Sequence, residues 1–247
     1  MNLDFLKRKD PLKGNISKHF IDIHSHILPC VDDGSQSNEQ SLTLLKLMVE
    51  LGIKHLVLTP HIMETVWENE SEDLKIRFQE FKNYLHKENF HEIQLYLAAE
   101  YMLDGNFQSL LKSERLLTIS DSYILVEMSY LNPPINLYEL LFDIQIAGYT
   151  PILAHPERYN FLHNNFEEYI KLKNAGCLLQ MNLLSVTNYY GKNVKDTAMK
   201  LLKESMIDFV GSDTHHEHHL KHLESINKPS LLKLLRPILL NNEKLYN

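Results

Sequence analysis

Cysteine is scarce in this chain, with only Cys30 and Cys177 among 247 residues and no CxxC spacing. This scarcity argues against a disulfide scaffold and a thiolate zinc site, and it fits a reducing cytoplasm. No apolar run approaches the roughly 18 residues that a membrane-spanning helix needs. The N-terminus also lacks the apolar region of a secretory signal. We therefore expect a cytoplasmic protein without a membrane span.

Clustered basic residues are absent as well, and the formal net charge is −7. Both features argue against a nucleic-acid partner. The chain has no GxSxG elbow, no GxxxxGK[ST] phosphate loop, no Asp-x-Asp motif and no Cys-x5-Arg loop. Covalent catalysis therefore has no obvious nucleophile.

Apolar, strand-like runs alternate with segments of helical periodicity. We predict strands at residues 20–25, 55–59, 93–100, 123–128, 150–154, 177–182 and 207–211. We predict helices within residues 38–51, 64–92, 136–147, 164–175 and 229–240, with Trp67 near the start of the second and Pro237 kinking or ending the last. Gly52, Gly148 and Gly176 follow three of these helices as C′ residues. The repeated order of helix, glycine and strand predicts an α/β fold with a parallel sheet.

The length suits one α/β barrel, because no linker divides the chain into two cores. Seven predicted strands, one fewer than in a complete barrel, indicate a distorted or incomplete one. We expect an N-terminal arm over residues 1–18 and a single domain over residues 19–247.

Imidazoles and carboxylates recur where the predicted strands end or just beyond them. The nine candidates are His24, His26, Asp33, His61, Glu100, Glu127, His155, Asp213 and His215. The carboxyl ends of parallel barrel strands meet on one face, so side chains from many strands can build a multinuclear metal site there. A donor set of nitrogen and oxygen without sulfur suits manganese, iron or zinc.

Each candidate also has an ordinary structural alternative. A single histidine at a strand end can be a satisfied, partly buried side chain, and Glu100 or Glu127 can form a buried salt bridge. We interpret Asp32 as an Asx-turn or a helix cap rather than a ligand. Of the histidines that follow Asp213 we assign only His215 to metal, and we expect the others to be exposed (residues 216, 218, 219 and 222).

Arg158 is the cation that we expect beside this site. It lies three residues after His155, and a guanidinium matches phosphate oxygens bidentately. The alternative is a structural ion pair with Glu157 or another nearby carboxylate.

At these residues the chain resembles the polymerase and histidinol phosphatase (PHP) superfamily. Within it, the chain is most similar to the bacterial manganese-dependent protein-tyrosine phosphatases of capsular and exopolysaccharide biosynthesis. The resemblance covers residues 20–215 in the family's order. It is carried by Asp22-Ile-His-Ser-His-Ile-Leu-Pro29, Asp32-Asp-Gly-Ser35, Thr59-Pro-His61, Ala99-Glu-Tyr101, Leu125-Val-Glu-Met128, His155-Pro-Glu-Arg-Tyr159 and Gly211-Ser-Asp-Thr-His215.

The resemblance implies a distorted seven-stranded β/α barrel, TIM-like and of the PHP type, with three divalent metal ions. Manganese is the first expectation, and iron and zinc are alternatives. One ion would be held by His24, His26, Glu100 and Asp213, a second by Glu100, Glu127 and His155, and a third by Asp33, His61 and His215. A metal-bridging hydroxide would hydrolyse phosphotyrosine, with Arg158 binding the phosphate. The implied partner is a tyrosine autokinase of a polysaccharide-export system.

Two other functions remain open at this stage. A small-molecule phosphatase such as histidinol phosphatase shares the superfamily's site. A metal-stabilised interaction module without catalysis is the alternative from another class, although an intact ligand set and Arg158 argue against it.

Overall fold

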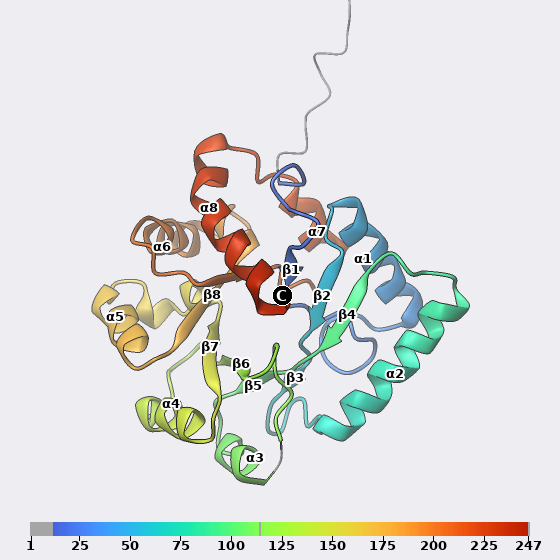
Figure 1. The fold of residues 1–247 in the computed structure, drawn as a ribbon. Helices are drawn as coiled ribbons and strands as arrows, with labels where there is room; N and C mark the ends of the chain where they lie inside the picture. Colours follow the sequence, from blue (N-terminus) through green and yellow to red (C-terminus); the bar gives the residue numbers. More distant parts are fainter. Residues whose placement is uncertain (1–11, 114, 247) are drawn as a thin grey trace, which may run out of the picture.

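The computed structural model describes residues 12–113 and 115–246 (Figure 1). Most of the predicted N-terminal arm, residues 1–11, lies outside these ranges. Within the described part, Leu12 is fully buried in the main hydrophobic core, and the Ser17 hydroxyl donates a hydrogen bond to Glu243 (2.7 Å).

The strands of the described residues form two sheets in which every pairing is parallel. One sheet has the order β1 (Ile21–Asp22), β2 (His55–Leu58) and β4 (Gln94–Leu97). The other has the order β3 (His61–Ile62), β5 (Glu100–Met102), β6 (Tyr123–Glu127), β7 (Thr150–Ala154), β8 (Leu178–Asn182) and β9 (Phe209–Gly211). The predicted parallel α/β architecture is therefore confirmed.

The closed seven-stranded barrel is not what the described residues form, because two predicted strand regions are divided between the sheets. The chain crosses from β2 to β3 at Thr59-Pro60 and from β4 to β5 at Ala98-Ala99. Pro60 has no N–H group to continue a ladder, which favours a break there. As a result Glu100 begins a strand rather than ending one, contrary to the predicted strand over residues 93–100.

The outer strands β1 and β9 approach each other without forming a regular ladder. Beyond their ends, Ser25 and Thr214 form an isolated parallel bridge, and the His26 N–H donates to the Thr214 carbonyl (2.9 Å). Farther back, the buried Asn242 amide donates to the carbonyls of Ile21 (2.9 Å) and Val210 (2.7 Å). This side chain supplies hydrogen bonds that a continuous ladder would otherwise make.

Helices surround the two sheets (Figure 1). They are α1 (Asn38–Glu50), α2 (Ser71–Lys87), α3 (Phe107–Ser113), α4 (Leu137–Ile146), α5 (Phe166–Asn174), α6 (Lys192–Lys203), α7 (Glu217–Leu223) and α8 (Pro229–Asn242). The predictions for α1, α4 and α5 are confirmed, and Gly52, Gly148 and Gly176 have φ angles of 91°, 89° and 78°, as C′ residues require. The helices α3, α6 and α7 were not predicted.

Two helix predictions need correction. Helix α2 begins at Ser71 instead of residue 64, and Trp67 lies in the preceding loop, where it forms an isolated bridge with Met63. Helix α8 continues through Pro237 to Asn242. Pro237 is exposed, so the carbonyl that loses its helical partner can bond to water.

The hydrophobic residues form two clusters. The larger packs helices against sheets, and the smaller fills the space between the strands with side chains such as Ile23, Val57, Leu125, Ile152 and Phe209. Polar side chains replace apolar ones where the strands end at their carboxyl termini. The fold thus gathers residues that are distant in sequence at one end of the sheets.

Candidate metal centre

All nine predicted ligands lie together, at or beyond the carboxyl ends of β1, β2, β4, β6, β7 and β9, and two of them, His61 and Glu100, begin the short strands β3 and β5. Their donor atoms form four overlapping groups, and within each group the donor atoms lie within 4.8 Å of one another. The groups are His26, Asp33, His61 and His215; His24, His26 and Asp213; His24, Glu100 and His155; and His61, Glu100 and Glu127. Most of these side chains are buried, whereas that of Asp33 is 55% exposed.

Glu100 occupies the middle of the cluster and is fully buried. Its Oε2 atom lies 3.1 Å from His24 Nε2, 3.2 Å from His26 Nε2 and 3.2 Å from His61 Nδ1. Its Oε1 atom lies 3.1 Å from His155 Nε2. Four imidazoles thus converge on one carboxylate, the arrangement that a bridging ligand between two ions requires.

Asp213 places its two oxygens in different surroundings. Its Oδ1 atom lies 3.4 Å from His24 Nε2, 3.5 Å from His26 Nε2 and 3.4 Å from His215 Nδ1. Its Oδ2 atom points away from these histidines and accepts hydrogen bonds from Arg158 and Asn182. Asp213 also has a positive φ of 52°, which is uncommon for aspartate and turns the chain directly after β9.

The two remaining carboxylates each face His61 from opposite sides of its ring. Asp33 Oδ1 lies 3.5 Å from His61 Nε2 and 3.4 Å from His215 Nε2. Glu127 Oε1 lies 2.9 Å from His61 Nδ1. The other oxygen, Glu127 Oε2, lies 3.9 Å from His155 Nε2. The geometry therefore brings His61 closest to Glu127, whereas the family resemblance allotted His155 to that carboxylate.

The donor set fits divalent cations. His61 Nδ1 and Glu127 Oε1 are buried and 2.9 Å apart, yet neither has a hydrogen-bond partner. Buried polar atoms that make no hydrogen bond are costly, and a cation held by both would remove that cost. Imidazole and carboxylate donors without sulfur are the ligands that manganese, iron and zinc accept.

A second ring of side chains orients the innermost histidines. The Nδ1 atom of His24 lies 2.7 Å from Gln180 Oε1, and that of His26 lies 2.8 Å from Asp32 Oδ2. These contacts leave both Nε2 atoms facing the cluster, as second-ring partners do in metal sites. Asp32 also accepts from the Gly34 N–H (2.9 Å), so the predicted Asx-turn is confirmed and carries an additional role.

Charged neighbours shift the pKa values of several side chains in the cluster. Burial lowers the pKa of His26, but Asp32 and Glu100 raise it well above the usual histidine value. Burial and His26 likewise oppose protonation of His61, but Glu100 and Glu127 raise the His61 pKa to about 9. Burial raises the pKa of Glu100, yet the histidines bring it well below its usual range. Metal binding to these ionised carboxylates and protonated imidazoles must therefore release protons.

Arg158 lies at the edge of the cluster, on the short 3-10 helix Pro156–Arg158. Its Nη1 donates to Asp213 Oδ2 (2.8 Å), and its guanidinium carbon lies 4.9 Å from the Tyr130 ring centroid and 4.4 Å from that of Tyr190. Its ion pair is with Asp213, whereas Glu157 Oε1 accepts from the Asn182 N–H (2.9 Å) and the Ser185 hydroxyl (2.5 Å). The alternative prediction, a structural ion pair between Arg158 and a nearby carboxylate, is met in part, because Asp213 is that carboxylate.

Several neighbouring residues were missed or misjudged from the sequence. Gln180 and Asn182 alternate with apolar residues in β8, and these polar positions in a buried strand were the available signal. Tyr130 and Tyr190 carried no such signal. His219 was expected to be exposed, but it is buried. Its Nδ1 accepts a hydrogen bond from the backbone N–H of His215 (3.2 Å). Among the neighbouring histidines, His216 is half-buried, whereas His218 and His222 are exposed as predicted.

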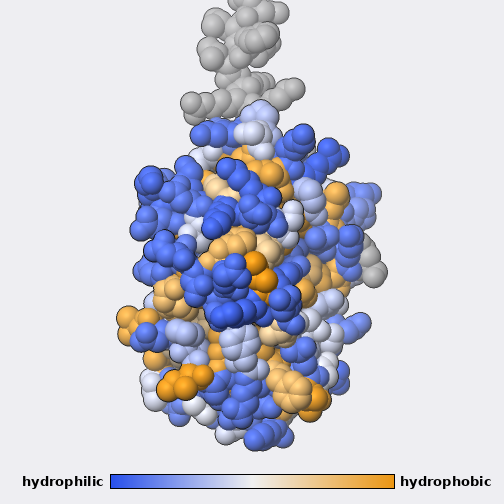
Figure 2. All heavy atoms as spheres, turned by 90° about the vertical axis from the view of Figure 1, so that its left-hand side faces the viewer, coloured by the Kyte–Doolittle hydropathy of each residue, from blue (hydrophilic) through white to orange (hydrophobic). Residues whose placement is uncertain are grey.

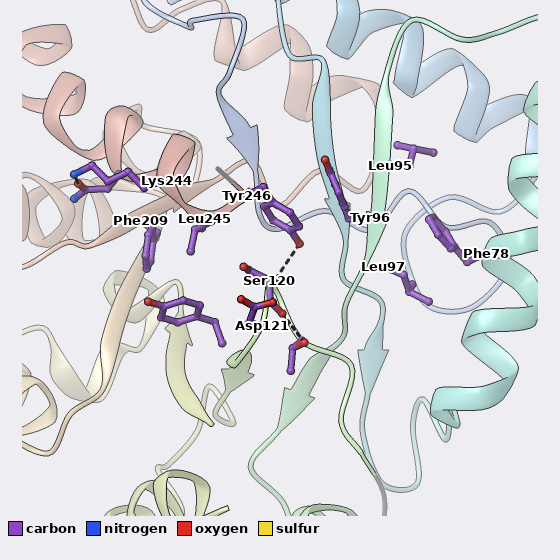
Figure 3. A pocket seen from close by; sticks show the side chains of 13 residues that line it. Phe78, Leu95, Tyr96, Leu97, Ser120, Asp121, Phe209, Lys244, Leu245 and Tyr246 are labelled. Carbon is purple, nitrogen blue, oxygen red and sulfur yellow. Dashed lines mark hydrogen bonds between the residues drawn. The ribbon is translucent and has the colours of Figure 1, made fainter. Parts of the chain in front are cut away.

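A separate cavity of about 930 Å³ opens near the amino ends of several strands (Figure 3). Tyr246 lines this cavity, and the centroids of its ring and of the Tyr96 ring are 4.2 Å apart. Its hydroxyl accepts a hydrogen bond from the Ser120 N–H (3.1 Å). None of the nine candidate ligands lines it. The candidate metal centre therefore does not coincide with this cavity.

The fold and the site define the class: an α/β protein with parallel sheets and a cluster of five histidines and four carboxylates that could hold metal ions. Residues 20–228 match the family described as "Capsular polysaccharide synthesis, CpsB/CapC". The chain belongs to this family.

Curated relatives support the assignment. The chain is 31% identical over 196 residues to the tyrosine-protein phosphatase YwqE of Bacillus subtilis, covering 79% of this chain and 77% of the relative. It is 31% identical over 201 residues to the tyrosine-protein phosphatase CpsB of Streptococcus pneumoniae, covering 79% and 82%.

Solved structures agree with the sequence comparisons. A crystal structure from work on YwqE of B. subtilis and CpsB of S. pneumoniae, described as metal-dependent tyrosine phosphatases, matches with a TM-score of 0.76 at 28% identity. It covers 90% of this chain and 94% of that one. Histidinol phosphate phosphatase of Lactococcus lactis matches with a TM-score of 0.52 at 13% identity, covering 87% and 93%, which shows a shared fold alone.

Proposed function

We propose that this chain is a metal-dependent protein-tyrosine phosphatase. The observation that carries the proposal is the convergence of four imidazoles on Glu100, with Arg158 Nη1 2.8 Å from Oδ2 of the adjoining Asp213. Family membership and the two named tyrosine-protein phosphatases support the same reaction.

The nine clustered side chains are the ligands of three divalent ions in this proposal, and manganese is the preferred metal. Glu100 would contribute to holding two of the ions, because both of its oxygens face histidines. When bound, the ions supply an activated water and positive charge for the phosphoryl oxygens. The contact between the ends of β1 and β9 supports the interpretation of the two sheets as one distorted seven-stranded barrel.

Arg158 binds the phosphate of the substrate. Its Nη1 donates to Asp213, which leaves the other N–H groups of the guanidinium to meet phosphate oxygens. The Tyr130 and Tyr190 rings flank the guanidinium and limit its motion. Tyr130, 42% exposed, offers an aromatic surface against which the substrate phenyl ring can stack.

The proposed physiological substrate is the phosphotyrosine of a tyrosine autokinase in polysaccharide export, since the family is described by capsular polysaccharide synthesis. A cytoplasmic location remains a prediction from the scarcity of cysteine. In the part of the chain that the structure describes, none of the helices combines the length and apolarity needed to cross a membrane.

Substrate comparison tests the proposed function. Purified, manganese-loaded protein should hydrolyse p-nitrophenyl phosphate and phosphotyrosyl peptides, with little activity on phosphoseryl peptides and histidinol phosphate, and a chelator should abolish the activity. Preference for histidinol phosphate would instead support the small-molecule alternative. No hydrolysis of any of the four substrates by metal-loaded protein would support the interaction module.

A further inference from the structure

A groove of about 540 Å³ lies beside the metal centre. One wall contains Met63, Met102 and Leu103, and the other contains Leu131, Pro133 and Pro134. The first wall continues from β3 and β5, which begin with the candidate ligands His61 and Glu100. The second continues from β6, which ends at Glu127. The strands that position three ligands therefore also build the groove.

Tyr130 connects the groove with the proposed phosphate site. It lines the groove, and its ring centroid also lies 5.7 Å from that of His155 and 4.9 Å from the Arg158 guanidinium carbon. A phosphotyrosine whose phosphate meets Arg158 would thus have its neighbouring residues at the groove. An extended chain advances roughly 3.3–3.6 Å per residue, so the adjacent residues are the ones that reach it.

The groove adjoins the main concentration of exposed apolar side chains. Among the described residues, six of the nine large apolar side chains that are exposed lie between positions 130 and 146: Tyr130, Leu131, Ile135, Tyr138, Phe142 and Ile146. Figure 2 views the side of the molecule that carries α4, and hydrophobic spheres lie near its lower end. A concentration of exposed apolar side chains in one stretch of the chain is a common feature of interaction sites.

Carboxylates stand at one end of the groove. Glu64 and Asp104 both line it, and Asp104 Oδ2 accepts from the Glu64 N–H (2.7 Å), which ties the two segments together. An adjoining cavity of about 300 Å³ shares these two residues and adds Glu68 and Glu70. A basic side chain of a ligand would be favoured at this end, and an acidic one would be repelled.

We propose that this groove binds the residues next to phosphotyrosine in the substrate protein. An apolar side chain lies between the methionine wall and the proline wall, and a lysine or arginine meets Glu64 and Asp104. Methionine side chains adapt their shape to different apolar partners, which suits a site that must accept more than one sequence. The proposal rests on the proposed phosphatase function and names the feature that selects among phosphotyrosine proteins.

Leu131→Asp tests the apolar part of the groove with little risk to folding, because Leu131 is 81% exposed. The matched control is Ile76→Asp, which changes a 59% exposed apolar side chain on α2. Each variant is assayed with p-nitrophenyl phosphate and with phosphotyrosyl peptides that carry leucine and lysine on either side of the phosphotyrosine. We expect Leu131→Asp to lower kcat/KM for the preferred peptide about tenfold, mainly through KM, because apolar burial is lost. Hydrolysis of p-nitrophenyl phosphate, and both activities of Ile76→Asp, should stay within about twofold.

Glu64→Lys tests the charged end. This variant should lower kcat/KM for the lysine-bearing peptide. It should raise kcat/KM for a matched peptide in which glutamate replaces lysine. Unchanged peptide kinetics in Leu131→Asp would overturn the groove assignment, as would equal losses with both substrates. A shift in sedimentation of Leu131→Asp without a change in peptide kinetics would instead identify the surface as an interface between copies of this chain.

A binding measurement tests the groove independently of the proposed phosphatase activity. A fluorescent peptide with a non-hydrolysable phosphonate in place of phosphate reports affinity whether or not the protein is a phosphatase. Weaker binding to Leu131→Asp than to Ile76→Asp supports the groove even if no substrate is hydrolysed. Equal binding to both variants contradicts it, even if phosphatase activity is present.

Discussion

Replacing Arg158 with alanine separates phosphate binding from metal binding. Arg158 and Asn182 both donate to Asp213 Oδ2, at 2.8 Å and 2.6 Å, so Asn182 can keep the carboxylate oriented when the arginine is removed. Arg158→Ala should therefore retain its metal ions. It should lower kcat/KM for a phosphotyrosyl peptide by roughly 10²–10³, or about 2.7–4 kcal/mol, the scale for one preorganised donor to a developing charge. Arg158→Lys should recover only part of the loss, since an ammonium lacks the bidentate fork.

The matched control is Asn182→Ala, which removes the other donor to Asp213 but leaves the guanidinium in place. We expect this variant to lose metal affinity, because it loosens a ligand. Metal-loaded samples of both variants should be compared by steady-state kinetics and by elemental analysis. If Arg158→Ala loses metal in proportion to its activity, then Arg158 acts through Asp213 rather than on phosphate. If kcat/KM stays within a few-fold while the Tm falls, its role is structural.

Further expectations follow from other positions. Glu100→Gln should lose more than one ion by elemental analysis, because one carboxylate faces two sets of histidines; full metal content would rule out bridging. Cys30→Ser and Cys177→Ser should keep most activity, and iodoacetamide at pH 8 should label only Cys30 in the native protein, because burial raises the pKa of Cys177 to about 12. Gly211→Ala should weaken metal binding, since the added Cβ would lie 2.5 Å from His24 Cβ; unchanged affinity would show that the strand shifts freely.

The sequence predicted the fold where local patterns are decisive. Apolar periodicity located α1, α4 and α5, and glycines at positive φ fixed where they end. It could not show that β2 and β3 join different sheets, because pairing partners are set by packing between distant segments. Pro60 was the local signal of that break. Pro237 does not end α8, because the effect of proline on a helix depends on whether the freed carbonyl can reach water.

The candidate ligands were predictable because they interrupt apolar strands near their ends, where uncompensated charge would be costly. All nine lie in one cluster, although their role as ligands remains a proposal. Their grouping was less accessible to sequence reasoning. His61 approaches Glu127 more closely than His155 does, and such distances arise from the packing of segments that are far apart in sequence. Tyr130 and Tyr190 come from loops, and their contact with Arg158 arises only in the folded chain.

Manganese titration of the metal-free protein is the most direct test of the central claim. The protein would be stripped with a chelator, and hydrolysis of a phosphotyrosyl peptide would be followed as Mn²⁺ is added to a known concentration of chain. A three-ion site predicts negligible activity in the stripped protein and full recovery as about three equivalents bind. Activity that survives complete removal of metal would contradict the account, as would full recovery with a single bound ion.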